Sequence, residues 1–149
     1  MANTYTQIFI HIVFTTKNRE PVLAEARRDD LFRYIWGIHQ KHHCHLHRIN
    51  GVEDHLHILT SLHPTVSLAD YMREIKTGSS LWIKREGVFP GFNGWQDGYG
   101  AFTVSLSEKA AVIEYIKQQQ EHHRTVSFIE EYKALLEAAG VDYDKRYLV

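Results

Sequence analysis

Histidine is the residue type in this sequence that is best suited to metal-assisted chemistry, and eleven are present. His55 and His57 flank Leu56. On a β-strand, where successive side chains alternate between faces, both imidazoles would point the same way. Two imidazoles on one strand supply half of the ligands of a metal site. Because alternating polar residues also occur on the solvent face of many sheets, this run alone does not establish such a site.

A second group of reactive side chains lies towards the C-terminus. Tyr115, Gln119 and His123 are spaced at i, i+4 and i+8, so they form a stripe on one side of a helix predicted for residues 107–123. For an isolated tyrosine and glutamine, we would favour core packing and solvation respectively. If this helix instead lies across a sheet that carries the histidines, Gln119 adds an oxygen ligand to the two imidazole nitrogens. Tyr115 then lies beside the metal.

The elements that position these residues follow from hydrophobic periodicity and turn residues. Strands are predicted at 5–16, 45–50, 54–59 and 101–105, and helices at 23–41, at 65–85 with Ser67 as N-cap, from Ser107 to about His123, and from Ser127 to Ala139 before Gly140. The order β-α-β-β-α-β predicts an α+β fold, a ferredoxin-like sandwich with an antiparallel four-stranded sheet and added C-terminal helices. Its first two helices would cover one face of the sheet, and the other face would be free for a site.

Length and composition indicate one domain over residues 1–149. Seventeen basic and eighteen acidic side chains give a net charge of −1, which argues against coating of nucleic acid through bulk charge. Any contact with DNA must therefore be local. Basic residues follow the first predicted strand and occur in the second predicted helix, where they could bind phosphates or form a solvated charged face. They are Lys17, Arg19, Arg73, Lys76, Lys84 and Arg85.

Compartment and zinc binding can also be addressed from the sequence. Cys44 is the single cysteine, so no internal disulfide forms, and the longest apolar stretch, Ile8 to Phe14, is too short to span a bilayer. Without a signal peptide at the N-terminus, we expect a cytoplasmic protein with no membrane segment. Histidines at 42, 43, 45 and 47 surround Cys44. A zinc site is disfavoured there, because structural zinc usually takes four ligands from two separated pairs.

Five segments in a fixed order resemble a known family. They are Ile12–Leu23, Asp54–His57, Trp95–Phe102, Tyr115–Gln119 and His122–His123. Together they are similar to the single-tyrosine HUH transposases of small insertion sequences, including the REP-associated tyrosine transposases, over nearly the whole chain. One departure is Val52-Glu53-Asp54 in place of the Met-Pro-Asn often found before the histidine pair, which concerns substrate details more than the reaction.

The resemblance implies a DNA transposase that cuts and rejoins single-stranded DNA bearing hairpins, through a 5′-phosphotyrosine. It implies a divalent metal, Mg²⁺ or Mn²⁺, held by His55, His57 and Gln119, with Tyr115 as nucleophile and His123 beside the ligands. Mixed nitrogen and oxygen ligands fit Mn²⁺ at least as well as Mg²⁺. A homodimer is also implied, in which the tyrosine helix of one chain can complete the site of the other. On an open sheet face His55 would be half-exposed, so its replacement should leave the fold intact.

Two other function classes are compatible with parts of the pattern. A non-catalytic RNA-binding or single-stranded-DNA-binding module can share the ferredoxin-like fold, but it would need exposed aromatic residues on the free sheet face, where the third strand offers His55 and His57. The run of glycine and aromatic residues that is characteristic of such modules is absent, although residues 98–102 resemble it weakly. A metal nuclease that cuts with water is the second alternative. Of these, the transposase requires Tyr115 as a chemical participant.

Overall fold

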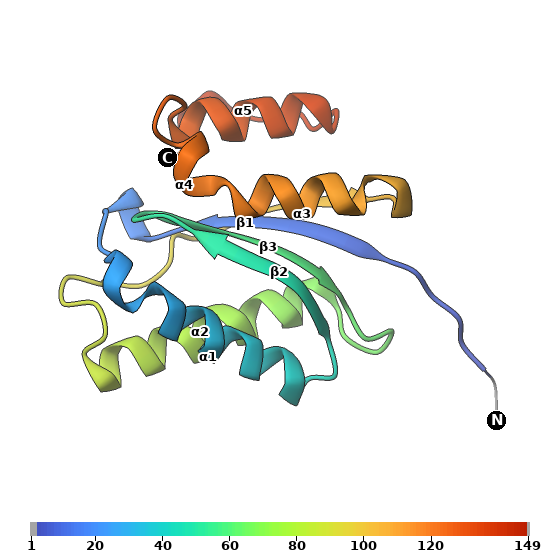
Figure 1. Ribbon diagram of the computed structural model, residues 1–149, viewed down its shortest axis with the longest axis horizontal. Helices are drawn as coiled ribbons and strands as arrows, with labels where there is room; N and C mark the ends of the chain where they lie inside the picture. Colours follow the sequence, from blue (N-terminus) through green and yellow to red (C-terminus); the bar gives the residue numbers. More distant parts are fainter. Residues whose placement is uncertain (1–2, 149) are drawn as a thin grey trace.

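The order of elements confirms the predicted α+β fold in the computed structural model, which describes residues 3–148 (Figure 1). The strands pair antiparallel in the order β2-β3-β1-β4, the arrangement of a ferredoxin-like sheet. They are β1 (Phe9–Thr15), β2 (His45–Gly51), β3 (His55–Ser61) and β4 (Gly100–Val104). The first strand therefore begins four residues later than predicted.

Helices α1 (Glu25–Lys41) and α2 (Leu68–Glu86) pack against one face of the sheet (Figure 1). The main core lies in this layer, where each fully buried leucine or isoleucine contributes about 1.5–3 kcal/mol. Its fully buried members include Ile12, Leu31, Ile35, Leu56, Ile58 and Ile75. As predicted, Ser67 caps α2 by accepting a hydrogen bond from the Asp70 amide.

The other face of the sheet, predicted to be free for a site, is covered by helices, which is the arrangement in which Tyr115 and Gln119 were expected to reach the histidines. Three helices lie over it: α3 (Lys109–Lys117), α4 (Gln119–His122) and α5 (Phe128–Ala138) (Figure 1). The physical reason is that this face of the sheet carries apolar side chains beside its histidines. Phe9 and Leu59 form a second, smaller core with Ile116 of α3, and leaving them in water would forgo their burial energy.

The helix predicted to run from Ser107 to His123 is interrupted at Gln118, which separates α3 from α4. Asn50 at the end of β2 explains the break, because its Nδ2 donates hydrogen bonds to the carbonyls of Ile116 and Lys117 at 2.9 and 3.1 Å. These carbonyls would otherwise accept from amides in the next helical turn. The N-cap also differs from the prediction. Ser105 rather than Ser107 precedes the first turn.

Helix α5 follows the prediction closely. Ser127 accepts from the amide of Glu130, whose carboxylate accepts from the Ser127 amide in return, the reciprocal arrangement of a capping box. Gly140, just past the end, has a φ of 68°, a conformation that glycine adopts without steric cost. None of the helices described between residues 3 and 148 is long and apolar enough to cross a membrane.

Candidate active site

His55 and His57 lie on the face of β3 that contacts His123 and, on α5, Glu131, and Leu56 and Ile58 belong to the core on the opposite side. The alternation predicted from the sequence is thus confirmed. The prediction that His55 would be half-exposed is wrong, because His55 and His57 both have 0% exposed surface. The C-terminal helices bury them, so replacing His55 now carries a packing cost that the sequence analysis did not anticipate.

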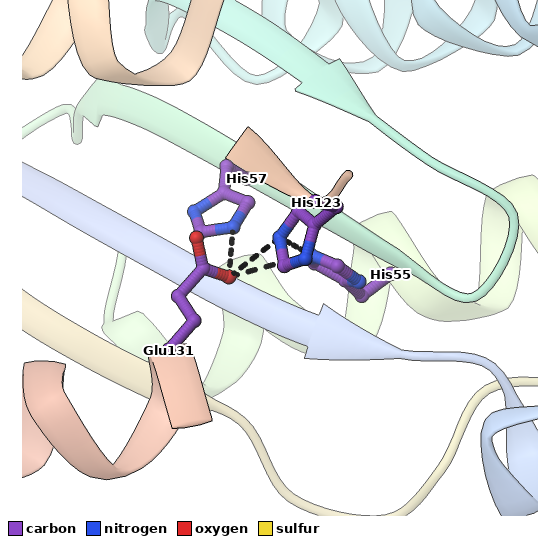
Figure 2. Close-up of side chains that lie close together, drawn as sticks. All are labelled: His55, His57, His123 and Glu131. Carbon is purple, nitrogen blue, oxygen red and sulfur yellow. Dashed lines mark hydrogen bonds and ion pairs between the residues drawn. The ribbon is translucent and has the colours of Figure 1, made fainter. Parts of the chain in front are cut away.

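Two further side chains converge on the histidine pair, His123 after α4 and Glu131 from α5 (Figure 2). Oε1 of Glu131 lies 3.0 Å from Nε2 of His57, 3.1 Å from Nε2 of His123 and 3.4 Å from Nε2 of His55. Nε2 of His123 also lies 3.0 Å from Nε2 of His55. Four potential metal ligands are therefore within 4.8 Å of one another.

Gln119 and Tyr115 reach the same place despite the interruption in their helix. Gln119 is fully buried, and its Oε1 lies 3.0 Å from Nε2 of His123. The hydroxyl of Tyr115 donates a hydrogen bond to Oε2 of Glu131, and its ring centroid lies 5.7 Å from that of His57. Burial and the Glu131 carboxylate raise the pKa of Tyr115 above its ordinary value. The structure thus brings together all four residues singled out for metal binding and nucleophilic attack.

Each of the three imidazoles is oriented by a partner on its Nδ1. Nδ1 of His55 lies 2.7 Å from Oδ1 of Asp54, and Nδ1 of His123 donates to the carbonyl of Val126 at 2.8 Å. Nδ1 of His57 lies 2.9 Å from Nε2 of His11 on β1. Such partners fix ring orientation in metal sites and leave the opposite nitrogen directed at the ion.

The protonation states in the cluster depend on two opposing effects. Burial disfavours charged groups, and contacts between groups of opposite charge favour them. Burial raises the pKa of Glu131, but hydrogen bonds from His123, His55 and His57 outweigh it and leave the pKa below its ordinary value. Burial also opposes protonation of His55, yet Asp54 and Glu131 raise its pKa overall. Burial lowers the pKa of His57 to about 4. A buried, ionised carboxylate therefore faces at least one neutral imidazole.

This set of donors fits a divalent cation. Unprotonated imidazole nitrogens and carboxylate oxygens are ligands for Mn²⁺ and related ions, and carboxylate and amide oxygens also suit Mg²⁺. Two imidazole nitrogens 3.0 Å apart, at His55 and His123, repel through their lone pairs unless a proton or a cation lies between them. Among residues 3–148, this is the one place where three or more such ligands meet. The histidines around Cys44 form no comparable group among these residues.

The basic residues considered for phosphate binding do not gather at the histidine cluster. Arg73, Lys76, Lys84 and Arg85 are on α2, across the sheet from it (Figure 1). Arg73 pairs with Asp70 and Arg85 with Glu86. Lys76 donates to the carbonyls of Gln96 and Gly98, so it holds the loop before β4. Lys17 and Arg19 form the short 3-10 turn η1 (Lys17–Arg19) after β1.

Sequence analysis missed Glu131 and His11. A signal for Glu131 was present, because it lies three residues after Phe128 and five before Leu136, on the buried face of α5, where a carboxylate requires a partner. His11 interrupts an apolar strand in the same way. In both cases the residue type was visible in the sequence, but its partner came from another element.

Comparisons with known proteins agree with this geometry. Residues 4–119 match the family model for IS200-like transposases. The ISDra2 transposase TnpA of Deinococcus radiodurans is 24% identical over 120 residues, which cover 77% of this chain and 86% of that protein.

Two solved structures are similar to the chain. The crystal structure of a candidate transposase from Deinococcus radiodurans has a TM-score of 0.59 at 24% identity, over 80% of this chain and 96% of that one. A REP-associated tyrosine transposase, solved bound to a REP hairpin, has a TM-score of 0.62 at 16% identity, over 85% of this chain and 76% of that one. With most of its length matched by the family model, the chain belongs to the IS200-like transposases, enzymes that cleave and rejoin DNA.

Proposed function

We propose that this transposase cleaves single-stranded DNA and transfers the strand through a covalent 5′-phosphotyrosine on Tyr115, with the help of a divalent metal. The observation that supports the proposal is that Tyr115 lies beside the histidine pair. Its hydroxyl donates to the carboxylate of Glu131, whose other oxygen faces His55 and His57. A tyrosine with only a packing role would not need its hydroxyl at a cluster of potential metal ligands.

The side chains that would hold the cation are His55, His57 and Gln119, with His123 packed beside them. Gln119 supports this role because its amide is fully buried and its oxygen points into the cluster at His123. When bound, Mg²⁺ or Mn²⁺ would polarise the scissile phosphate and offset the charge on the leaving 3′ oxygen. The imidazole nitrogens favour Mn²⁺ at least as much as Mg²⁺.

The chain's own contribution to the reaction is the nucleophile and its placement. The phenolic oxygen of Tyr115 forms a bond to phosphorus, the bond between phosphorus and the 3′ oxygen breaks, and the leaving 3′ oxygen takes up a proton from solvent to become a hydroxyl. Before the reaction, the phenolic hydroxyl donates a hydrogen bond to Glu131. This carboxylate is therefore in position to accept the phenolic proton. Because the phosphotyrosine keeps the energy of the phosphodiester, a second 3′-hydroxyl can reverse the step without ATP.

The proposed substrate is a single strand that carries a hairpin. The similar REP-associated transposase was solved with a REP hairpin, and a net charge of −1 requires contacts with DNA to be local. The basic residues on η1 and α2 are the proposed phosphate contacts, for DNA that extends beyond the histidine cluster: Lys17, Arg19, Arg73, Lys76, Lys84 and Arg85. We also propose a homodimer, on the basis of the family.

The decisive experiment is a search for a covalent protein–DNA adduct. The chain would be incubated with random-sequence single strands and Mn²⁺ and separated under denaturing conditions. We expect an adduct with the wild type and with Tyr5→Phe, which alters a tyrosine that is 89% exposed, but none with Tyr115→Phe.

EDTA should abolish the adduct, and ordinary duplex should not replace the single strand. An adduct with Tyr115→Phe would refute the nucleophile, and full activity in EDTA would refute the metal. Cleavage without any adduct would instead indicate a nuclease that uses water.

A further inference from the structure

Glu131 has no part in the ligand set that the family resemblance implies, and it lies on α5, beyond the segment 4–119 that matches the family model. We propose that Glu131 has two roles in the catalytic centre. Its Oε1 is a ligand for the divalent cation, and its Oε2 holds the hydroxyl of Tyr115 next to the ion. This inference rests on the proposed function and assigns to this chain a residue that the family match does not cover.

The two oxygens of the carboxylate face different partners. Oε1 lies 3.0 to 3.4 Å from the Nε2 atoms of His57, His123 and His55 (Figure 2). Oε2 accepts the hydrogen bond from Tyr115 and lies 3.3 Å from Nε2 of His122. One side chain therefore joins the candidate metal ligands to the candidate nucleophile.

Glu131 is a buried carboxylate, and its charge needs compensating partners. Glu131 is 3% exposed, and a buried carboxylate is stable only when charged or hydrogen-bonding partners compensate it. Its Oε1 faces the imidazoles of His57, His123 and His55. A divalent cation at the Nε2 atoms would supply positive charge at the point where Oε1 is directed.

The chemistry of the expected ligand set points the same way. His55, His57 and Gln119 are neutral as ligands, and Mg²⁺ and Mn²⁺ are usually bound with the help of at least one carboxylate. Glu131 supplies that negative charge. The fold brings it there because α5 begins after the turn at 123–127, in which the carbonyl of Val126 accepts from His123.

Mn²⁺ binding gives a test that does not depend on cleavage. Aqueous Mn²⁺ has a sharp paramagnetic resonance signal that is lost on binding, so its dissociation constant can be measured for the free protein. The variant is Glu131→Gln, which keeps the shape and one accepting oxygen but removes the charge. Glu137→Gln is the matched control, because Glu137 lies on the exposed side of the same helix and pairs with Tyr143.

We expect Glu131→Gln to weaken Mn²⁺ binding by at least about tenfold, as loss of the supporting groups of metal sites does, and Glu137→Gln to leave it unchanged. If wild type and His57→Gln both fail to bind Mn²⁺, the proposed function itself fails. If wild type binds, His57→Gln does not, and Glu131→Gln binds like wild type, the metal site stands and the ligand role of Glu131 is overturned.

Should Glu131→Gln not fold, as judged by circular dichroism, wild-type crystals soaked in Mn²⁺ decide the matter. Anomalous density within about 2.5 Å of Oε1 supports the ligand, and an ion that contacts the histidines but lies beyond that distance from both carboxylate oxygens overturns it.

The second role is tested by Glu131→Ala, which leaves the Tyr115 hydroxyl without its acceptor. At saturating Mn²⁺, the adduct should form at least about tenfold more slowly with Glu131→Ala than with Glu131→Gln, since small displacements of a nucleophile cost this much or more. Equal rates in the two folded variants would show that Glu131 does not position Tyr115.

Discussion

Nε2 of His11 lies 2.9 Å from Nδ1 of His57, which links β1 to the centre of the candidate metal site. The two rings stack with centroids 5.1 Å apart. Both are buried, and burial lowers the pKa of His11 to about 3. Because one proton shared between these nitrogens decides whether Nε2 of His57 is free to bind a cation, His11 sets the state of a proposed ligand without contacting the ion.

His11→Phe should therefore weaken Mn²⁺ binding by about 10- to 100-fold, as does loss of the partner of a ligating histidine in other metal sites. Phenylalanine fills the volume of the ring but cannot exchange a proton with His57. His11→Gln, whose amide can donate or accept, should recover part of the affinity. Titration of both folded variants with Mn²⁺ checks this, and equal affinities for His11→Phe and wild type would show that His57 is oriented without His11.

Asn50 should control the position of Tyr115 through the end of α3. Its amide donates to the carbonyls of Ile116 and Lys117 and to Oε1 of Gln120, directly after the nucleophile in the chain. Asn50→Ala should lower the free energy of unfolding by about 1–3 kcal/mol, because buried acceptors lose their donor. Adduct formation should fall further than the folded fraction explains.

Urea unfolding and adduct assays of Asn50→Ala, with the exposed Asn93→Ala as control, measure the two effects. If Asn50→Ala folds as stably as the control and reacts at the wild-type rate, the interruption between α3 and α4 has another cause.

His39, away from the active site, should make the fold sensitive to acid. It is buried between α1 and α2, with Nε2 accepting from the Tyr71 hydroxyl at 2.6 Å and Nδ1 donating to the carbonyl of Ile35 at 2.8 Å. Burial lowers its pKa from 6.5 to about 4. Between these values the unfolded chain binds a proton that the folded chain does not, so stability falls as the pH drops from 6.5 to 4.

The contribution of His39 is up to about 3 kcal/mol. His39→Gln, which can still accept from Tyr71, should be less sensitive than wild type over this range, even though other buried histidines remain. Urea unfolding at pH 7.5, 6 and 5 measures the difference between the two proteins. Parallel curves for wild type and variant would mean that His39 is protonated in the folded chain as readily as in the unfolded one.

The local patterns of the sequence were sufficient for most of the fold and most of the side chains of the site. Alternation around His55 and His57 predicted their shared face correctly, since a strand imposes a period of two whatever surrounds it. The start of α5 beside Ser127 could also be predicted from neighbouring residues alone. Tyr115, Gln119 and His123 were expected at the histidines and lie there.

What could not be predicted depended on contacts between distant elements. The interruption after Lys117 requires Asn50, more than sixty residues earlier in the chain. The burial of His55 requires Phe128 of α5, whose ring centroid lies 4.6 Å from that of His55. A role for Glu131 can be inferred only when the three imidazoles around it are known. The family model, which ends at Gln119, does not cover Phe128 or Glu131.

The final prediction concerns whether one chain or two build the active site. The family resemblance suggested a homodimer in which the tyrosine of one chain completes the metal site of the other. In the structure, Tyr115 is held by Glu131 of the same chain, over His57 of the same chain. The turn at 118 and the segment at 123–127 are anchored to this arrangement by Asn50 and by the bond between His123 and Val126. We therefore predict a site that is complete within one chain.

Two inactive variants distinguish the arrangements. Tyr115→Phe lacks the nucleophile, and His57→Gln lacks a metal ligand. Differently tagged, they would be mixed under conditions that allow subunit exchange, and light scattering would establish whether mixed dimers form. With self-contained sites, no chain in the mixture has both Tyr115 and His57, so no adduct should appear in verified mixed dimers or in monomers. If sites are shared between chains, the wild-type His57 of the Tyr115→Phe chain would act with Tyr115 of its partner. An adduct carried by the His57→Gln chain alone would therefore refute the self-contained site.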